Sequence, residues 1–101
     1  MKTPRIPVPY DQIAAFCHKW KVTELALFGS VLTDEFRPDS DVDVLVTYGP
    51  DAIRTFDAFF EMQDELKAIF GREIDLVNKS TLRNPYIKKH VMESYQVVYA
   101  A

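Results

Sequence analysis

The sequence has very little cysteine and glycine and no long apolar run. Among its 101 residues are one cysteine, Cys17, and three glycines. A single cysteine excludes an intramolecular disulfide and is typical of proteins in a reducing compartment. No stretch approaches the roughly 18 apolar residues of a membrane-spanning helix, and the N-terminal residues lack the apolar run of a signal peptide. We therefore expect a cytoplasmic protein that makes no membrane contact.

The sequence also lacks an excess of basic residues. Twelve Lys and Arg stand against fifteen Asp and Glu, which gives a formal net charge of −3. General nucleic-acid binding depends on a basic surface that neutralises phosphates, so this balance argues against it. Hydrophobic residues make up 48% of the chain and charged residues 27%, as in ordinary globular domains. The length predicts a single domain over residues 1–101.

Hydrophobic periodicity predicts an α/β fold. Residues 1–9, with three prolines, are predicted to form an extended lead-in. Helices are expected from residue 10 to about 21, as a short turn at 31–33, at 53–70, and from residue 80 or 84 to about 94. Strands are expected at 22–28, 41–48, 73–78 and, as an edge strand, 96–99. This order predicts a small mixed β-sheet with helices packed on it.

The longest predicted helix, at 53–70, is rich in aromatic residues. Asp51 is predicted as its N-cap and Gly71 as the residue that ends it. Spacings of three and four residues predict that its phenylalanines face the core: Phe56, Phe59, Phe60 and Phe70.

Two aspartates share one face of the second predicted strand. Asp41 and Asp43 are two residues apart, so their side chains project together, while Val42, Val44 and Val46 face the opposite way. At about 4 Å, two carboxylates repel by ~1 kcal/mol in water and ~4 kcal/mol at an effective dielectric of 20. A shared proton or a cation would relieve this repulsion, and such hard oxygen donors suit Mg²⁺. The alternative is a solvent-facing strand end.

A third acidic residue and a Gly-Ser pair extend the candidate site. If the strand at 73–78 neighbours the second strand, Asp75 completes a three-carboxylate site. Such a site can hold two metal ions roughly 3.5–4 Å apart for in-line displacement at phosphorus. Gly29 and Ser30 follow a strand, where glycine permits close approach of an anion and the serine hydroxyl can donate to phosphate. The alternatives are an edge-strand charge for Asp75 and a helix cap for Ser30.

The combined pattern resembles a known enzyme family. Gly29-Ser30, ten intervening residues, Asp41-x-Asp43 and the downstream Asp75 resemble the DNA polymerase β-like nucleotidyltransferase superfamily. More narrowly, they resemble the minimal nucleotidyltransferases that serve as antitoxins in HEPN/MNT toxin–antitoxin pairs. The resemblance implies the polymerase β-like fold, ATP held through its triphosphate by Gly29 and Ser30, and Asp41, Asp43 and Asp75 as catalytic residues and Mg²⁺ ligands, with two ions bound.

The same resemblance implies a reaction and a partner. Members of this group transfer AMP from ATP to a tyrosine hydroxyl of a cognate HEPN-type ribonuclease toxin, which silences the toxin. A hetero-oligomeric complex with that toxin is therefore expected. Two alternatives stay open: a non-catalytic antitoxin that acts by binding alone, and a nucleotidyltransferase whose acceptor is a small molecule.

One part of the sequence departs from the family pattern. Many relatives carry arginines directly after Gly-Ser, whereas residues 31–34 here read Val-Leu-Thr-Asp. A cation that could contact the phosphates is therefore missing from this position. Arg37, Arg72 and Lys79 are the candidates to replace it.

Overall fold

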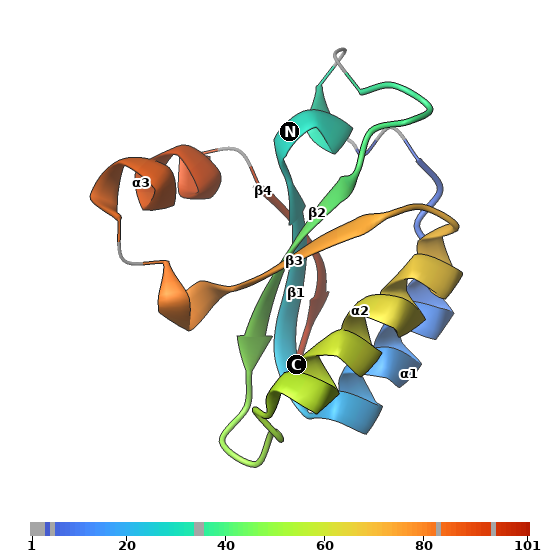
Figure 1. The fold of residues 1–101 in the computed structure, drawn as a ribbon, viewed down its shortest axis with the longest axis vertical. Helices are drawn as coiled ribbons and strands as arrows, with labels where there is room; N and C mark the ends of the chain where they lie inside the picture. Colours follow the sequence, from blue (N-terminus) through green and yellow to red (C-terminus); the bar gives the residue numbers. More distant parts are fainter. Residues whose placement is uncertain (1–3, 5, 34–35, 83, 94) are drawn as a thin grey trace.

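Two helices cover one face of a four-stranded β-sheet (Figure 1). The computed structural model describes residues 4, 6–33, 36–82, 84–93 and 95–101. The elements follow in the order α1 (Tyr10–Trp20), β1 (Val22–Phe28), the 3₁₀ turn η1 (Gly29–Leu32), β2 (Val42–Tyr48), α2 (Phe56–Phe70), β3 (Ile74–Asn78), the 3₁₀ turn η2 (Lys79–Thr81), α3 (Pro85–Glu93) and β4 (Tyr95–Ala100).

The sheet is mixed, as predicted. Its strand order is β3-β2-β1-β4. β1 pairs antiparallel with β2 and with β4, whereas β2 and β3 run parallel and are joined through α2. The parallel pair needs such a crossover because its two strands start at the same end of the sheet. The predicted α/β fold is therefore confirmed, and β4 is the edge strand that the C-terminal pattern indicated.

The main core lies between the sheet and the helices α1 and α2. Three alternate residues of β2 are fully buried there: Val42, Val44 and Val46. Helix α1 contributes the stripe that its spacing predicted: Ile13, Phe16, Cys17 and Trp20. Burying a large apolar side chain contributes roughly 1.5–3 kcal/mol. Since side chains alternate along a strand, the residues between these valines project from the other face of the sheet.

A smaller apolar cluster lies on that other face. Ala26 and Leu45 from the sheet contact Val91 of α3 there. In Figure 1, α3 stands beside the sheet and leaves the start of β2 uncovered. This face is the one on which the acidic residues of β2 and β3 lie.

Helix α2 begins three residues later than predicted. Its N-cap is Thr55, whose side chain accepts a hydrogen bond from the Ala58 backbone N–H, so the prediction of Asp51 as N-cap is wrong. Residues 53 and 54 instead belong to the loop that follows β2. The helix ends at Gly71, which has a left-handed conformation (φ +68°), as predicted.

The face of α2 that packs on the sheet is also different from the one predicted. The buried side chains are spaced four residues apart: Ala58, Met62 and Leu66. Phe59 and Phe70 lie half-buried against the core, but Phe56 and Phe60 are 84% and 60% exposed. Placing Phe56 and Phe60 in the core was therefore wrong. Apolar residues occupy so much of this helix that spacing alone does not select the buried stripe.

Other boundaries differ by one to three residues. The turn predicted at 31–33 is η1, which already starts at Gly29, and the strand predicted from Asp41 starts at Val42. The last predicted helix is two elements, η2 and α3, and the Asn84 side chain accepts from the Tyr86 backbone N–H at the start of α3. Residues 4 and 6–9 of the lead-in form neither helix nor strand, and residues 1–3, 5, 34, 35, 83 and 94 lie outside the described part.

None of the helices in the described ranges is long and apolar enough to span a membrane.

Candidate active site

Three neighbouring strands align an acidic pair on the open face of the sheet. Phe28 of β1 lies opposite Asp43 of β2, and Asp43 lies opposite Asp75 of β3. Val42 and Val44, on either side of Asp43, are fully buried in the main core, so the Asp43 side chain projects from the opposite face. Asp75 therefore neighbours Asp43, which is the condition that the sequence analysis set for a shared site.

The two carboxyl groups interact directly. Burial, the negative charges of Asp75 and Asp41, and a hydrogen bond with Asp75 together raise the pKa of Asp43 to about 6, with burial as the largest cause. A hydrogen bond between two carboxyl groups requires a proton on one of them. Near neutral pH that proton is lost and the pair carries uncompensated negative charge. The pair therefore presents two hard oxygen donors that gain from a nearby cation.

This arrangement makes the stability of the metal-free protein depend on pH. The Asp43 carboxyl holds its proton more tightly in the folded state, with a pKa of about 6, than at its ordinary value of 3.8. Its contribution to stability is therefore present at low pH and is lost as pH rises from about 4 through 6. We expect the loss to be roughly 1–2 kcal/mol, allowing for the part of the group that stays in solvent.

Thermal unfolding in EDTA at pH 4.5 and pH 7.5 measures this dependence. Asp43→Asn should remove most of the difference between the two pH values, because an amide does not titrate. An unchanged pH dependence in that variant would show that other groups cause it.

Asp41 lies just before β2 and is exposed. Its charge contributes to the raised pKa of Asp43, so it is within electrostatic reach of the pair. Across the described residues, however, no three His, Cys, Asp or Glu side chains are arranged to hold one metal ion. The structure thus forms the Asp43–Asp75 pair, while the full set of three ligands stays a prediction. The pair still fits Mg²⁺, which needs only one or two protein carboxylates when phosphates supply further oxygens.

Gly29 packs its backbone directly against the Asp43 carboxylate. It has φ +76°, and a Cβ at this position would overlap with Asp43 Oδ2 and lie 3.3 Å from its Cγ. The Ser30 carbonyl oxygen accepts from both the backbone N–H and the hydroxyl of Thr33, each at 2.9 Å. Thr33 thus closes the turn η1 that presents Gly29 and Ser30 beside the acidic pair. The Gly-Ser backbone and the carboxylates meet at one point of the sheet.

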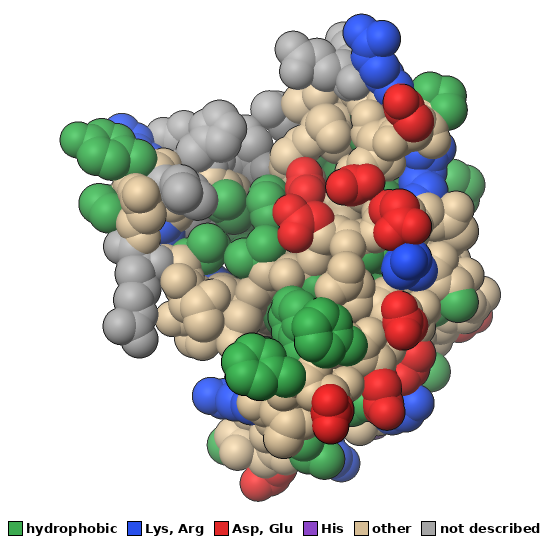
Figure 2. Space-filling model, in the orientation of Figure 1, with side chains coloured by type: hydrophobic (Ala, Val, Ile, Leu, Met, Phe, Trp, Pro, Cys, Tyr) green, Lys and Arg blue, Asp and Glu red, His purple; other side chains and the backbone are tan. Residues whose placement is uncertain are grey.

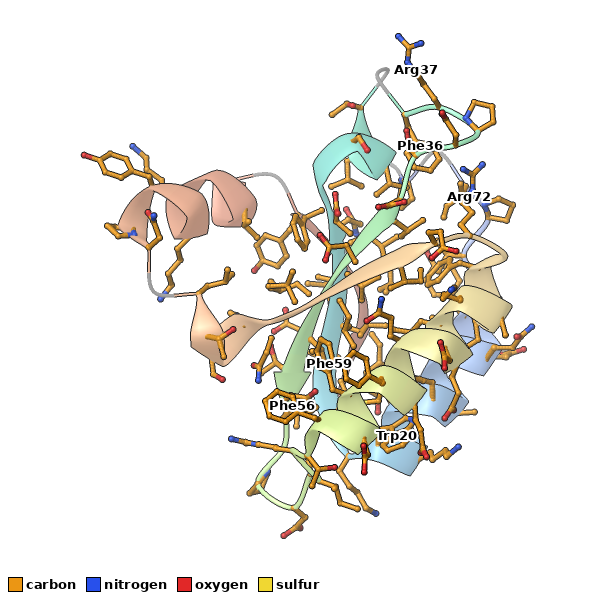
Figure 3. The ribbon with its side chains drawn as sticks, in the orientation of Figure 1. Trp20, Phe36, Arg37, Phe56, Phe59 and Arg72 are labelled. Carbon is orange, nitrogen blue, oxygen red and sulfur yellow. The ribbon has the colours of Figure 1, made fainter. Side chains whose placement is uncertain are left out.

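The Arg72 side chain binds to the loop that precedes β2. Its Nη1 donates to the carbonyl oxygens of Arg37 (3.2 Å) and Pro38 (3.0 Å), and its guanidinium lies 4.6 Å from the centre of the Phe36 ring (Figure 3). The Val42 backbone N–H also donates to Glu73 O at 2.9 Å. Arg72 therefore ties the segment before Asp41 to the segment before Asp75. Sequence reasoning missed this positioning role because no periodicity marks it.

The other two candidate cations lie elsewhere. Arg37 is exposed and points away from the sheet at the tip of the same loop (Figure 3). Lys79 lies 3.8 Å from Glu24, whose neighbour on β2 is Thr47, at the far end of that strand from Asp43. Lys79 is thus excluded as a replacement for the missing arginine in this arrangement.

Comparisons with known proteins agree with this geometry. The family model of the nucleotidyltransferase domain matches residues 11–98. The protein adenylyltransferase MntA of Thermococcus cleftensis is 37% identical over 81 residues, which cover 80% of this chain and 77% of that protein.

Solved structures show the same fold. A crystal structure of a toxin–antitoxin with AMP-PNP matches with a TM-score of 0.72 at 18% identity, over 92% of this chain and 74% of that one. The structure of a tri-AMPylated Shewanella oneidensis HEPN toxin in complex with MNT antitoxin matches with a TM-score of 0.65 at 18% identity, over 91% and 70%. The fold is the polymerase β-like fold of minimal nucleotidyltransferases. The chain belongs to the nucleotidyltransferase domain family and is a nucleotidyltransferase.

Proposed function

We propose that this chain is an antitoxin that transfers AMP from ATP to a tyrosine hydroxyl of a HEPN-type ribonuclease in the presence of Mg²⁺. The observation that carries the proposal is the Asp43–Asp75 pair with the Gly29 backbone against it. Support also comes from the relative named a protein adenylyltransferase and from the fold shared with an antitoxin bound to an AMPylated HEPN toxin.

Each residue of the site has a task in this reaction. Asp43 and Asp75, with Asp41 nearby, would hold the Mg²⁺, which when bound neutralises phosphate charge and polarises the α-phosphorus. The backbone at Gly29 and the Ser30 hydroxyl would hold the triphosphate. Arg72 keeps the two acid-bearing segments in register. Most of the rate gain then comes from positioning and charge neutralisation, as in other phosphoryl transfers.

The chemical step is a displacement at phosphorus. The tyrosine oxygen forms a bond to the α-phosphorus of ATP, the bond from that phosphorus to the bridging oxygen breaks, and pyrophosphate leaves. The phenolic proton passes to a carboxylate, for which Asp75 is suited because its side chain is exposed beside Asp43. Asp41 is exposed too, so a protein surface can approach the acidic residues directly.

Transfer to a protein can be measured directly. We would incubate the purified chain with α-labelled ATP, Mg²⁺ and the protein encoded by the adjacent gene, and then map any label by mass spectrometry. We expect label on a tyrosine of that protein, and none when EDTA replaces Mg²⁺. A tight complex without label would instead favour an antitoxin that acts by binding alone. In a second incubation with a cell extract, label found only in the low-mass fraction would favour a small-molecule acceptor.

A further inference from the structure

An apolar groove opens between the start of α2 and the end of β3. It has a volume of about 530 Å³, and its apolar walls are Tyr48, Phe56, Phe59, Phe60, Leu76 and Val77. We call it the phenylalanine groove. Phe56 and Phe59 lie side by side below β3 in the view of Figure 3, with Phe56 over the end of β2. None of the catalytic tasks described above uses these side chains.

The groove displays aromatic rings to solvent. Phe56 is 84% exposed and Phe60 is 60% exposed, although both sit on a helix with a well-buried opposite face. The rings of Phe59 and Phe60 lie edge to face with 6.0 Å between their centres, a contact that favours this orientation of the pair. Exposed aromatic rings around a cavity are typical anchor points of protein–protein contacts.

The groove and the candidate active site share the edge strand β3. Its β3 wall consists of Leu76, Val77 and Asn78, which directly follow Asp75. At about 3.3 Å per residue, Asp75 and Asn78 are roughly 10 Å apart along the strand. A polypeptide segment that rests in the groove and passes over the edge of β3 can therefore reach the carboxylates on the other face of the sheet.

The charge next to the groove selects the kind of segment. Asp57, Glu61 and Asp64 are exposed along α2 at helical spacing, and within the described residues none of them forms an ion pair. Figure 2 shows Asp and Glu side chains in a line beside the hydrophobic patch. Arg54 lines the groove, but it is turned onto the adjoining loop, where it donates to Gly49 O at 3.3 Å and stacks on Tyr48 at 5.5 Å. An apolar surface flanked by negative charge complements apolar side chains flanked by Lys or Arg.

We propose that the phenylalanine groove binds a segment of the acceptor protein that carries apolar side chains flanked by Lys or Arg, and thereby brings the neighbouring acceptor tyrosine to Asp43 and Asp75. This inference rests on the proposed function, because the segment belongs to the protein that receives AMP. The groove would determine which protein is modified, and the carboxylates would perform the transfer.

Binding without nucleotide tests the groove independently of the chemistry. We would measure the affinity of the chain for the protein encoded by the adjacent gene by calorimetry, using Phe56→Ala/Phe60→Ala as the test variant. We expect at least about tenfold weaker binding, because truncating an aromatic anchor typically has that effect or more. Tyr86→Ala is the matched control, since Tyr86 is an aromatic residue on α3 that is 85% exposed.

A second variant tests the charge. Glu61→Lys/Asp64→Lys changes only exposed positions of α2 and should weaken binding more at low salt than at high salt. Equal affinity of wild type and both double variants would overturn the proposal, as would an equal loss in Tyr86→Ala. If the variants lost self-association of this chain but kept acceptor binding, the groove would be assigned to a second copy of this chain, and the proposal would also be overturned. Groove-dependent binding with no label transfer by the wild type would refute the proposed function and leave the docking surface standing.

Discussion

Asp43→Asn is expected to reduce nucleotidyl transfer about 10³-fold or more while raising the thermal stability of the metal-free protein. The activity falls because the variant loses a charged donor for Mg²⁺, whose contribution of about 4 kcal/mol to transition-state stabilisation corresponds to a factor of about 10³. The stability rises because the substitution removes the partly buried charge that repels Asp75 and Asp41. Label transfer and thermal unfolding in EDTA measure the two effects on the same preparation.

The opposite signs of these two effects make the test specific. Asp51→Asn is the control, because Asp51 is exposed in the turn beyond the far end of β2 and should change neither property. Substitution of a residue that mainly stabilises the fold would lower the activity and the stability of the protein together. Full activity in Asp43→Asn, or a lower unfolding temperature in EDTA, would contradict the acidic site described here.

Gly29→Ala is expected to cost about 2–4 kcal/mol of stability and about a hundredfold in activity. Alanine is strained at φ +76°, and its Cβ would overlap with the Asp43 carboxylate, so either the turn η1 or the carboxylate must move. A displacement of about 1 Å at a reacting centre can lower the rate by about 10². For a domain of this size the stability loss corresponds to a fall of roughly 10 °C or more in unfolding temperature.

Gly71→Ala separates the two causes of this effect. Gly71 has nearly the same backbone angle, φ +68°, but a Cβ there meets nothing within 4 Å. The control should therefore lose only the backbone term, about 1 kcal/mol, and retain full transfer activity. If Gly29→Ala behaves like Gly71→Ala in both assays, the contact between Gly29 and Asp43 contributes neither to stability nor to activity.

The acidic residues could be singled out from the sequence because they depend on alternation within a strand. Asp43 stands between two valines and Asp75 between two aliphatic residues, so each had to leave the apolar face. The sequence could not establish that the Asp43 and Asp75 side chains are neighbours, because this depends on β3 pairing in parallel with β2 rather than with another strand. The contact of Gly29 with Asp43 depends on the β1–β2 register as well, which no local pattern specifies.

The residues of α2 show where sequence reasoning failed and why. Periodicity identifies an amphipathic helix only when polar residues occupy enough of its circumference. In α2 four phenylalanines accompany the buried Met62 and Leu66, so more than one stripe satisfies the spacing. The choice is made by contacts with β2 and β3, which lie far away in sequence. The surplus apolar residues became the phenylalanine groove.

The acidic pair lies on the side of the sheet away from the main core, and this has an evolutionary consequence. The carboxylates contribute nothing to the packing of α1 and α2 on the sheet, and their mutual repulsion works against folding. Mutations that remove one of these carboxylates therefore destroy catalysis but raise the stability of the fold. Under selection for abundance alone, a lineage of such chains would drift toward stable, inactive descendants that still carry an intact phenylalanine groove. Only a continuing demand for the chemistry itself keeps the aspartates in place.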